Sequence, residues 1–416
     1  MNRPAIRTAG RVTVFCQDVP YPPTHGGKLD LWNLLRALHG EGNAIQLVCW
    51  FRHERISSRV RTELSKVAED VIEVPRRDGL WRLLILKYPP RMLAFKPSTR
   101  EYARLVDRVA AFGPNWILLD HWLAYLPARA VATDLSKVLV YRSQNVEHRY
   151  YREQSRLARG ILKLKLAANL RRLFAAEREI RNTVDLVADI SSDDRMEWEA
   201  LGETRPGIVV PPIWLDSPPP SSLGVEQDID LLFVGNLRTP NNVEGLRWFT
   251  KQVLPILRHE LKTPVRVTFA GSEPDPRDLE SWRQDGVDCE ANPPDVSGFY
   301  QRARVVINPL QRGSGVNLKM IEAFAAGKPV VATQVAARGL PDAVRSYFSI
   351  TATPQAFAAR LHDILLAEAR CVDRAERAAL VARYFGTGNL APLAQALEAL
   401  LLARSASAPE IRPNLP

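Results

Sequence analysis

Hydrophobic positions follow two patterns along this chain, short apolar runs and longer segments in which leucine recurs every three or four residues. Residues 12–15, 45–51 and 116–119 are apolar runs, which are typical of buried strands. Between the first two runs, residues 31–38 carry leucines at helical spacing. This order of strand, helix and strand predicts an α/β fold with a doubly wound parallel sheet and right-handed crossovers.

The second half of the chain repeats this pattern. Apolar runs at residues 231–234, 265–270 and 305–307 each lead into a loop that contains glycine. The carboxyl ends of parallel strands meet at one edge of a sheet, so we expect these loops to line a common cleft.

Domain organisation follows from length and from a proline-rich segment. A chain of 416 residues is longer than one core usually serves, and residues 211–222 contain two proline clusters that mark a linker. We predict two Rossmann-like domains at residues 1–217 and 218–389, a helix at about residues 390–403 and a disordered tail at residues 404–416.

Residues 303–333 form the unit around which the second half is organised. A strand ends at Asn308, residues 313–315 read Gly-Ser-Gly, residues 317–326 form a helical pattern and a second strand follows. Such a unit directs free backbone N–H groups and the positive end of a helix to the sheet edge, which favours phosphate. An ordinary crossover with a tight glycine turn has the same spacing, so the pattern alone leaves both interpretations open.

Composition indicates a folded protein of a reducing compartment. Hydrophobic residues make up 46% and charged residues 25% of the chain, and its four cysteines are widely spaced without a CxxC pair. No apolar run approaches the roughly 20 residues that span a bilayer, and the N-terminus lacks a signal-peptide core. We therefore expect a cytoplasmic protein.

The net charge of +10 is concentrated in two segments of the first half, residues 76–108 and 149–181. Within the first of them, residues 80–86 (LWRLLIL) combine apolar and basic side chains. They could form a helix packed on its own domain or a patch that contacts an anionic membrane surface. A nucleic-acid-binding protein is a further class that such charge allows, but no recognised nucleic-acid motif accompanies it.

Four stretches carry a resemblance to a known family. They are GSGVNLKMIEAFAAGKPVVAT with the following residues 338–340, PYPPTHGGKLDLWNLLRAL, IVVPPIWLD and LLFVGNLRTPNNVEGLRWF. Together they resemble glycosyltransferase family 4, the group 1 enzymes with the two-domain GT-B fold. The resemblance implies retaining transfer of a hexosyl unit from a nucleoside diphosphate sugar to a saccharide or lipid-linked saccharide, in cell-surface polysaccharide or glycolipid synthesis.

The resemblance also assigns roles to individual residues. His121, directly after a strand, would contact the reacting sugar, and Asn145 and Glu147 would bind the acceptor unless they only cap the next helix. The last helix would pack back on the first domain. The expected donor-binding residues are Gly26, Gly27, Gly235, Asn236, Arg238, Gly271, Arg312, Gly313, Ser314, Gly315, Asn317, Lys319 and Glu322.

The sequence departs from the family at three of its positions. Many relatives have an arginine and a lysine where this chain has Asn236 and Asn242, so Lys319 with Arg312 or Arg238 would have to neutralise the diphosphate. The first of two family glutamates is replaced by Ser314, whereas the second is kept as Glu322.

Several functions remain compatible with the sequence. Asp228 and Asp230 form a DxD pattern, but they precede a strand instead of following one, so we expect no metal and no cofactor besides the sugar nucleotide. The alternatives to a glycosyltransferase are a sugar-nucleotide epimerase and a non-catalytic relative that binds a partner.

Overall fold

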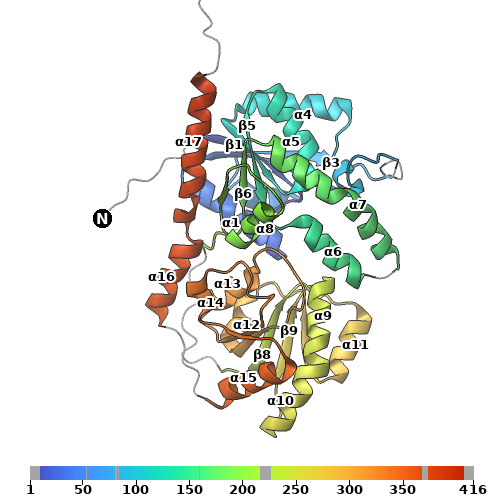
Figure 1. Ribbon diagram of the computed structural model, residues 1–416, viewed down its shortest axis with the longest axis vertical. Coiled ribbons are helices and arrows are strands. Elements are labelled where there is room, and N and C mark those ends of the chain that lie inside the picture. Colours follow the sequence, from blue (N-terminus) through green and yellow to red (C-terminus); the bar gives the residue numbers. More distant parts are fainter. Residues whose placement is uncertain are drawn as a thin grey trace, which may run out of the picture.

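The computed structural model describes residues 10–406, except 53, 80, 81, 83, 159, 216–225 and 368–372. Two α/β domains lie one above the other along the longest axis of the molecule (Figure 1). Each is built on one fully parallel sheet with helices on both faces. The architecture is therefore the pair of Rossmann-like domains that the repeated strand and helix pattern predicts.

The N-terminal sheet has the strand order β3-β2-β1-β4-β5-β6-β7. Its central strands are almost wholly buried, because helices cover both faces, and this explains their uninterrupted apolar runs. The strands are β1 (Arg11–Cys16), β2 (Ala44–Phe51), β3 (Asp70–Pro75), β4 (Trp116–Asp120), β5 (Val138–Ser143), β6 (Leu186–Asp189) and β7 (Gly207–Val209).

Two hydrophobic cores lie on the two faces of this sheet. Side chains of α4, α5 and α7 pack on one face, and those of α1 and α2 pack on the other. The helices of this domain are α1 (Gly26–Gly40), α2 (Ser58–Leu64), α3 (Pro90–Leu93), α4 (Thr99–Phe112), η2 (Trp122–Ala124), α5 (Tyr125–Asp134), α6 (Glu147–Leu157), α7 (Gly160–Thr183) and α8 (Ser192–Ala200).

The C-terminal sheet has the order β10-β9-β8-β11-β12-β13. Its strands are β8 (Ile229–Gly235), β9 (Val267–Gly271), β10 (Val287–Ala291), β11 (Ala303–Asn308), β12 (Val330–Thr333) and β13 (Ser349–Thr351). Its helices are α9 (Pro240–Trp248), η3 (Phe249–Val253), α10 (Leu254–Leu261), α11 (Pro276–Gln284), α12 (Ser297–Arg302), α13 (Leu318–Ala325), α14 (Asp342–Arg345), α15 (Pro354–Leu366) and α16 (Arg374–Phe385).

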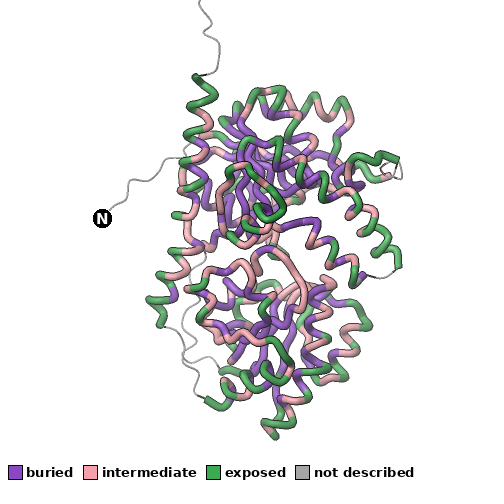
Figure 2. The backbone as a smooth tube through the Cα atoms, in the orientation of Figure 1, coloured by how far each residue is buried: buried purple, intermediate pink, exposed green. Residues whose placement is uncertain are grey.

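The chain returns to the first domain through η4 (Thr387–Leu390) and α17 (Ala391–Ala406). Leu393 and Leu397 of α17 are buried in the same core as α1, so the last helix belongs physically to the N-terminal domain. The last turn of this helix, residues 402–406, is exposed (Figure 2). The linker passes nearby, since Trp214 N donates to Phe385 O at 2.7 Å.

Two details differ from the sequence prediction. Helix α17 continues to Ala406, so residues 404–406 are helical instead of part of the disordered tail; Ser405 Oγ donates to Leu401 O at 2.6 Å in this last turn. Residues 407–416 and the predicted boundary at 217 lie outside the described residues. In the predicted 80–86 segment, residues 80, 81 and 83 lie outside the described residues; residues 84–86 are not helical, and Leu84 is 82% and Leu86 73% exposed, so they do not form the packed helix that was one of its two interpretations.

Candidate active site

The Gly-Ser-Gly loop lies directly against the N-terminal domain. Gly315 has φ 71°, and a Cβ atom there would lie 2.2 Å from Asn145 Oδ1 and 2.7 Å from Gln144 O. Only glycine permits this approach, because a side chain would collide with main chain of the other domain. Ser314 Oγ donates to Asn145 Oδ1 at 3.5 Å. The predicted donor loop and the predicted acceptor residue Asn145 are therefore neighbours.

Gly313 and Asn317 complete the loop that leads into α13. A Cβ atom at Gly313 would meet Val335 at 3.7 Å, an ordinary contact. Asn317 is the N-cap residue directly before α13, and its side chain makes no capping hydrogen bond. Asn317 therefore leaves the first N–H groups of the helix uncapped. A phosphate site at a helix N-terminus requires such free N–H groups.

Gly235 and Gly271 stand opposite each other at the carboxyl ends of β8 and β9. A Cβ atom on Gly271, which has φ 155°, would lie 1.7 Å from Gly235 O, so close strand packing requires glycine there. Asn236 Oδ1 accepts hydrogen bonds from Ser272 Oγ and from Arg238 N, both at 2.9 Å. These predicted donor residues form one rigid corner at the sheet edge.

Lys319 extends from α13 into this corner. A Cβ atom on Gly235 would lie 2.9 Å from Lys319 Nζ, and this nitrogen donates to Asn242 Oδ1 at 3.0 Å. The ammonium also lies 4.2 Å from the centroid of the Phe233 ring. Burial lowers the pKa of Lys319 to about 7, and the charge of Glu322 opposes the shift only in part. An anion at this corner would restore the charged form.

Glu322 lies one turn further along α13 and accepts a hydrogen bond from Tyr300 Oη at 3.0 Å. Tyr300 is 2% exposed, so its hydroxyl holds the carboxylate in one orientation. The sequence analysis missed Tyr300, because no local motif marks a tyrosine of α12 as a partner of α13.

The two arginines proposed beside Lys319 already have partners. Arg312 lies 3.2 Å from Glu244 and 3.4 Å from Glu153, and so bridges the two domains. Arg238 donates to Glu273 O at 2.6 Å, and its side chain is 61% exposed. Either one would have to leave these contacts to reach a diphosphate, and their donor roles stay predictions.

Gly26 and Gly27 begin α1 on the N-terminal side of the same region. A Cβ atom on Gly26 would lie 3.5 Å from the Leu318 side chain, and one on Gly27 would lie 3.5 Å from Gln144 Oε1. His25 caps the helix, since its Nδ1 accepts from Lys28 N at 3.4 Å. Both predicted glycines therefore face the start of α13 or the loop that carries Asn145.

His121 directly follows β4 and has a conformation that is rare for residues other than glycine, with φ 93° and ψ 139°. Such backbone costs roughly 1–3 kcal/mol and is concentrated at functional sites. Its Nδ1 accepts from Leu123 N at 3.4 Å, and its Nε2 lies 3.4 Å from Glu147 Oε1. Burial, assisted by the positive charge of Arg91, lowers the pKa of His121 to about 3. The imidazole is thus neutral, with its proton on Nε2.

Glu147 is 2% exposed, and burial together with Glu177 raises its pKa to about 8. The main-chain N–H groups of Glu147 and His148 donate to the Glu177 carboxylate at 2.7 and 2.8 Å. Glu177 of α7 therefore caps α6, and Asn145 makes no capping bond. The capping alternative for Asn145 is wrong, and its Nδ2 instead lies 3.5 Å from Glu147 Oε1.

A buried network of charged and amide side chains lies next to His121 in the fold. Arg142 Nη2 donates to Asp30 Oδ1 at 2.9 Å, and Gln144 Nε2 donates to Asp120 Oδ2 at 2.9 Å. Burial raises the pKa of Asp120 to about 6, although the charge of Arg142 opposes the shift. The network ties α1 to the ends of β4 and β5. Sequence reasoning missed it, because its members are far apart along the chain.

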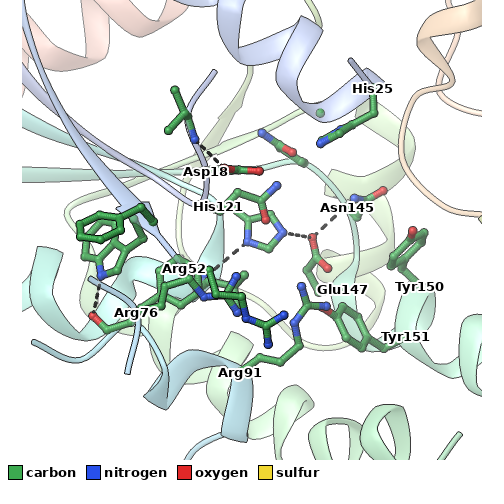
Figure 3. A pocket seen from close by; sticks show the side chains of 18 of the residues that line it. Asp18, His25, Arg52, Arg76, Arg91, His121, Asn145, Glu147, Tyr150 and Tyr151 are labelled. Atoms are coloured by element: carbon green, nitrogen blue, oxygen red, sulfur yellow. Dashed lines mark hydrogen bonds and ion pairs between the residues drawn. The ribbon is translucent and has the colours of Figure 1, made fainter. Parts of the chain in front are cut away.

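A cavity of about 580 Å³ opens in front of His121 and Glu147 (Figure 3). Its walls come from the ends of β1 to β5, from α3 and from α6. Tyr150 and Tyr151 close one side, and Asn145 lies where the cavity approaches the glycine loop. A ligand in this cavity would lie within reach of His121 and next to the loop of the other domain.

Two aspartate pairs have structural partners. Asp193 Oδ2 accepts from Gly339 N at 2.9 Å, and Asp194 lies 3.5 Å from Arg338, so this pair joins the domains. Asp228 pairs with Arg302 at 2.6 Å at the opposite edge of the second sheet from the glycine loops. In the described part of the chain, no three His, Cys, Asp or Glu side chains are grouped to hold a metal ion.

Comparison with known proteins finds a family match in the second domain. Residues 228–367, nearly the whole second domain, match the family described as Glycosyl transferases group 1. A Klebsiella pneumoniae protein described as an uncharacterized 44.6 kDa protein in the cps region is 25% identical over 347 residues, which cover 79% of this chain and 84% of that protein.

Solved structures share the fold at low sequence identity. Sucrose-phosphate synthase from Thermosynechococcus elongatus has a TM-score of 0.65 and 16% identity, over 96% of this chain and 100% of that one. Anabaena HepE in complex with UDP-glucose has a TM-score of 0.62 and 15% identity, over 95% and 100%. The second domain therefore matches the group 1 glycosyltransferases, and the chain as a whole has the two-domain GT-B fold of these structures.

Proposed function

We propose that this protein transfers a hexosyl unit from a nucleoside diphosphate sugar to a saccharide or lipid-linked saccharide, with retention of the anomeric configuration. The contact of the glycine loop with Asn145, beside the strained His121, is the observation that carries the proposal. It brings a phosphate-binding unit of one domain to the cavity of the other.

In this proposal the second domain binds the donor. Loop N–H groups and the start of α13 would face the diphosphate, Lys319 would supply the positive charge, and Glu322 would accept hydrogen bonds from the ribose hydroxyls. The transferred sugar would then lie between Ser314 and His121. No step requires a metal ion in this scheme, and the absence of a cofactor remains a prediction.

The reaction is a substitution at the anomeric carbon. The bond from this carbon to the diphosphate oxygen breaks, and a bond to an acceptor hydroxyl oxygen forms on the same face. The hydroxyl proton passes to the departing phosphate oxygen. The protein would stabilise the leaving group through backbone dipoles and Lys319, which is electrostatic catalysis. Asn145 and Glu147 would orient the acceptor hydroxyl.

We further propose that the protein acts in the cytoplasm at the inner membrane face, in cell-surface polysaccharide synthesis. The cps-region description of the Klebsiella relative supports the pathway. Exposed apolar side chains support membrane contact, since Leu84, Leu86, Ile161 and Leu164 are 71–82% exposed on the side of the domain formed by α7. Lys163 and Lys165 flank Leu164. Among the described helices, none is long and apolar enough to span a bilayer.

Vesicle flotation tests the membrane proposal. The protein should float with anionic vesicles and much less with neutral ones, and salt should release it, because each basic residue near the surface contributes about 1 kcal/mol. Replacing Leu84 and Leu86 by Asp should reduce flotation severalfold. Leu366→Asp in the other domain, where Leu366 is 67% exposed, is the matched control. Equal binding to neutral and anionic vesicles, or binding to neither, would reject docking to an anionic membrane surface.

The catalytic proposal is tested with UDP-, GDP- and ADP-sugars. One of them should raise the melting temperature, since a ligand that binds the native state stabilises it. Incubation with donor alone should leave the sugar configuration unchanged, which excludes an epimerase. Donor binding without transfer to any acceptor, including extracts of lipid-linked saccharides, would favour a non-catalytic relative.

A further inference from the structure

Three arginines line one wall of the cavity beside His121. Arg52 follows β2, Arg76 follows β3 and Arg91 lies in the first turn of α3. Figure 3 shows the three side chains gathered on the side of the cavity opposite Asp18 and His25. They come from separate elements that the fold brings to the same sheet edge as His121.

The positive charge of this wall exceeds its negative charge. Asp78 lies 2.7 Å from Arg52 and 3.1 Å from Arg82, so one carboxylate serves two guanidinium groups. Within the described part of the chain, no carboxylate lies within 4.0 Å of Arg76 or Arg91. Other contacts hold these two side chains, since Arg76 lies 5.0 Å over the Phe95 ring and Arg91 lies 5.5 Å over the Tyr151 ring.

Arg76 carries the strongest sign of an unmet partner. Its Nε is buried and has no hydrogen-bond partner among the described residues. Burial lowers its pKa, and the charge of Asp78 opposes the shift only in part, because the positive charges of Arg52, Arg91 and Arg82 add to it. A half-buried guanidinium among like charges is costly to the free protein, and an anion bound beside it would remove that cost.

The acidic groups of the cavity do not neutralise the positive charge of the three arginines. Asp18 is half exposed and lies 3.3 Å from Lys28, and Glu54 is exposed at the rim. Burial raises the pKa of Glu147, which favours its uncharged form at neutral pH. Arg52 and Arg91 are themselves accessible from the cavity, so a ligand can reach them.

We propose that the acceptor carries an anionic group, a carboxylate or a phosphoryl group, that binds Arg52, Arg76 and Arg91 while its reactive hydroxyl lies at His121 and Glu147. The inference rests on the proposed function and names the substrate class of its acceptor cavity. Guanidinium groups pair with both oxyanions through two parallel hydrogen bonds, which fixes orientation as well as charge. A uronic acid and a sugar phosphate both have this chemistry.

Equilibrium binding to the full-length protein saturated with UDP tests the inference. Glucuronate, glucose 6-phosphate and glucose are titrated and followed by ligand NMR, and UDP binding is measured separately by calorimetry. At least one charged sugar should bind about tenfold or more tightly than glucose, because its hydrogen bonds are charge-assisted. The stronger of the two distinguishes a carboxylate acceptor from a phosphoryl acceptor.

Variants then locate the binding. Arg76→Ala and Arg91→Ala should abolish the preference for the charged sugar while UDP affinity stays within about twofold. Arg76→Gln repeats the test with a side chain closer in size, in case the alanine variant unfolds. Arg59→Ala is the control, because Arg59 is exposed on α2 outside the cavity.

Each result tests either the anionic acceptor or the proposed glycosyl transfer. Normal UDP binding with equal or absent binding of all three sugars would overturn the anionic acceptor alone. A preference that survives in Arg76→Ala and Arg91→Ala would do the same. Failure to bind UDP, GDP or ADP would overturn the proposed function itself, and with it the inference.

Discussion

The two domains present different chemistry to the region where they meet. The C-terminal domain offers mainly backbone, with Gly235, Gly271 and Gly315 in tight contacts and one ammonium, Lys319. The N-terminal domain offers side chains, with arginines along the cavity and a strained, buried His121 next to Glu147. A diphosphate is the same in every sugar nucleotide and suits a backbone cradle, whereas an acceptor must be distinguished by side chains.

Lys319 is the proposed cation of the donor site. The resemblance implies a lysine where this chain has Asn242, and Asn242 accepts a hydrogen bond from Lys319 Nζ at 3.0 Å. The ammonium therefore lies beside the residue that replaces the family lysine, delivered from α13 and not from α9. We infer that Lys319 supplies from another position in the sequence the charge that the resemblance assigns to this lysine.

His121→Ala should have the largest effect on the acceptor side. We expect turnover to fall about 100-fold or more, with donor affinity nearly unchanged, because the imidazole would act mainly in the transition state. Steady-state kinetics combined with direct donor binding separates the two quantities. Full activity in this variant would mean that His121 only ends its strand.

A second substitution at the same position tests the strain. His121→Gly removes the imidazole as His121→Ala does, but glycine adopts φ 93° without cost. His121→Gly should therefore be about 1 kcal/mol more stable than His121→Ala in urea unfolding, at the low end of the cost of such backbone. Equal stability would argue against the strain.

Lys319→Ala should have the largest effect on the donor side. Loss of a charge-assisted, half-buried contact should weaken nucleotide binding by about 2 kcal/mol, roughly 30-fold. Asn242→Ala is a useful companion, since it removes the partner of Lys319 and keeps the charge. Unchanged nucleotide affinity in Lys319→Ala would reject its assignment to the diphosphate.

The pKa of Lys319 adds a pH dependence to this prediction. In the free protein it is lowered to about 7, and a bound diphosphate should raise it, because the anion favours the charged amine. Binding should then take up a proton above pH 7, and affinity should fall as pH rises further. Calorimetry in two buffers of different ionisation enthalpy measures this uptake, which Lys319→Ala should lack.

Glu322→Gln and Ser314→Ala should have the smallest effects, and they should be unequal. Glu322→Gln should weaken nucleotide binding by about 1 kcal/mol, since an amide has one acceptor oxygen for Tyr300 and ribose together. Ser314→Ala should change affinity by less than a factor of about two, as the main chain makes the expected contact. Equal losses in nucleotide titrations of both variants would contradict this ranking.

Much of the fold could be predicted from sequence, because its strands are buried on both faces and alternate with helices. The strands at residues 12–15, 231–234 and 305–307 lie inside β1, β8 and β11. For residues 80–86 the sequence left a packed helix and a surface patch open, because an apolar run alone does not distinguish a core-facing segment from an exposed one; the exposed, non-helical residues 84–86 do not fit the packed helix.

The site could be predicted only where a local motif marks it. The glycine loop, His121 and Glu322 follow such motifs, and the structure brings the first two to the same region. Sequence analysis did not identify Tyr300, Glu177 or the Arg142 network. Their partners are distant in sequence, and any polar residue type could make such hydrogen bonds. The sequence showed the positive charge of the N-terminal half, but it did not place the three arginines beside His121.

Nucleotide affinity in two paired variants tests the division between the domains most directly. UDP, GDP and ADP are screened first, and the tightest binder is titrated calorimetrically into the wild type, Lys319→Ala and Arg91→Ala. A donor site in the C-terminal domain predicts a loss of roughly 30-fold in Lys319→Ala and little change in Arg91→Ala. A loss in Arg91→Ala with unchanged binding in Lys319→Ala would contradict the account.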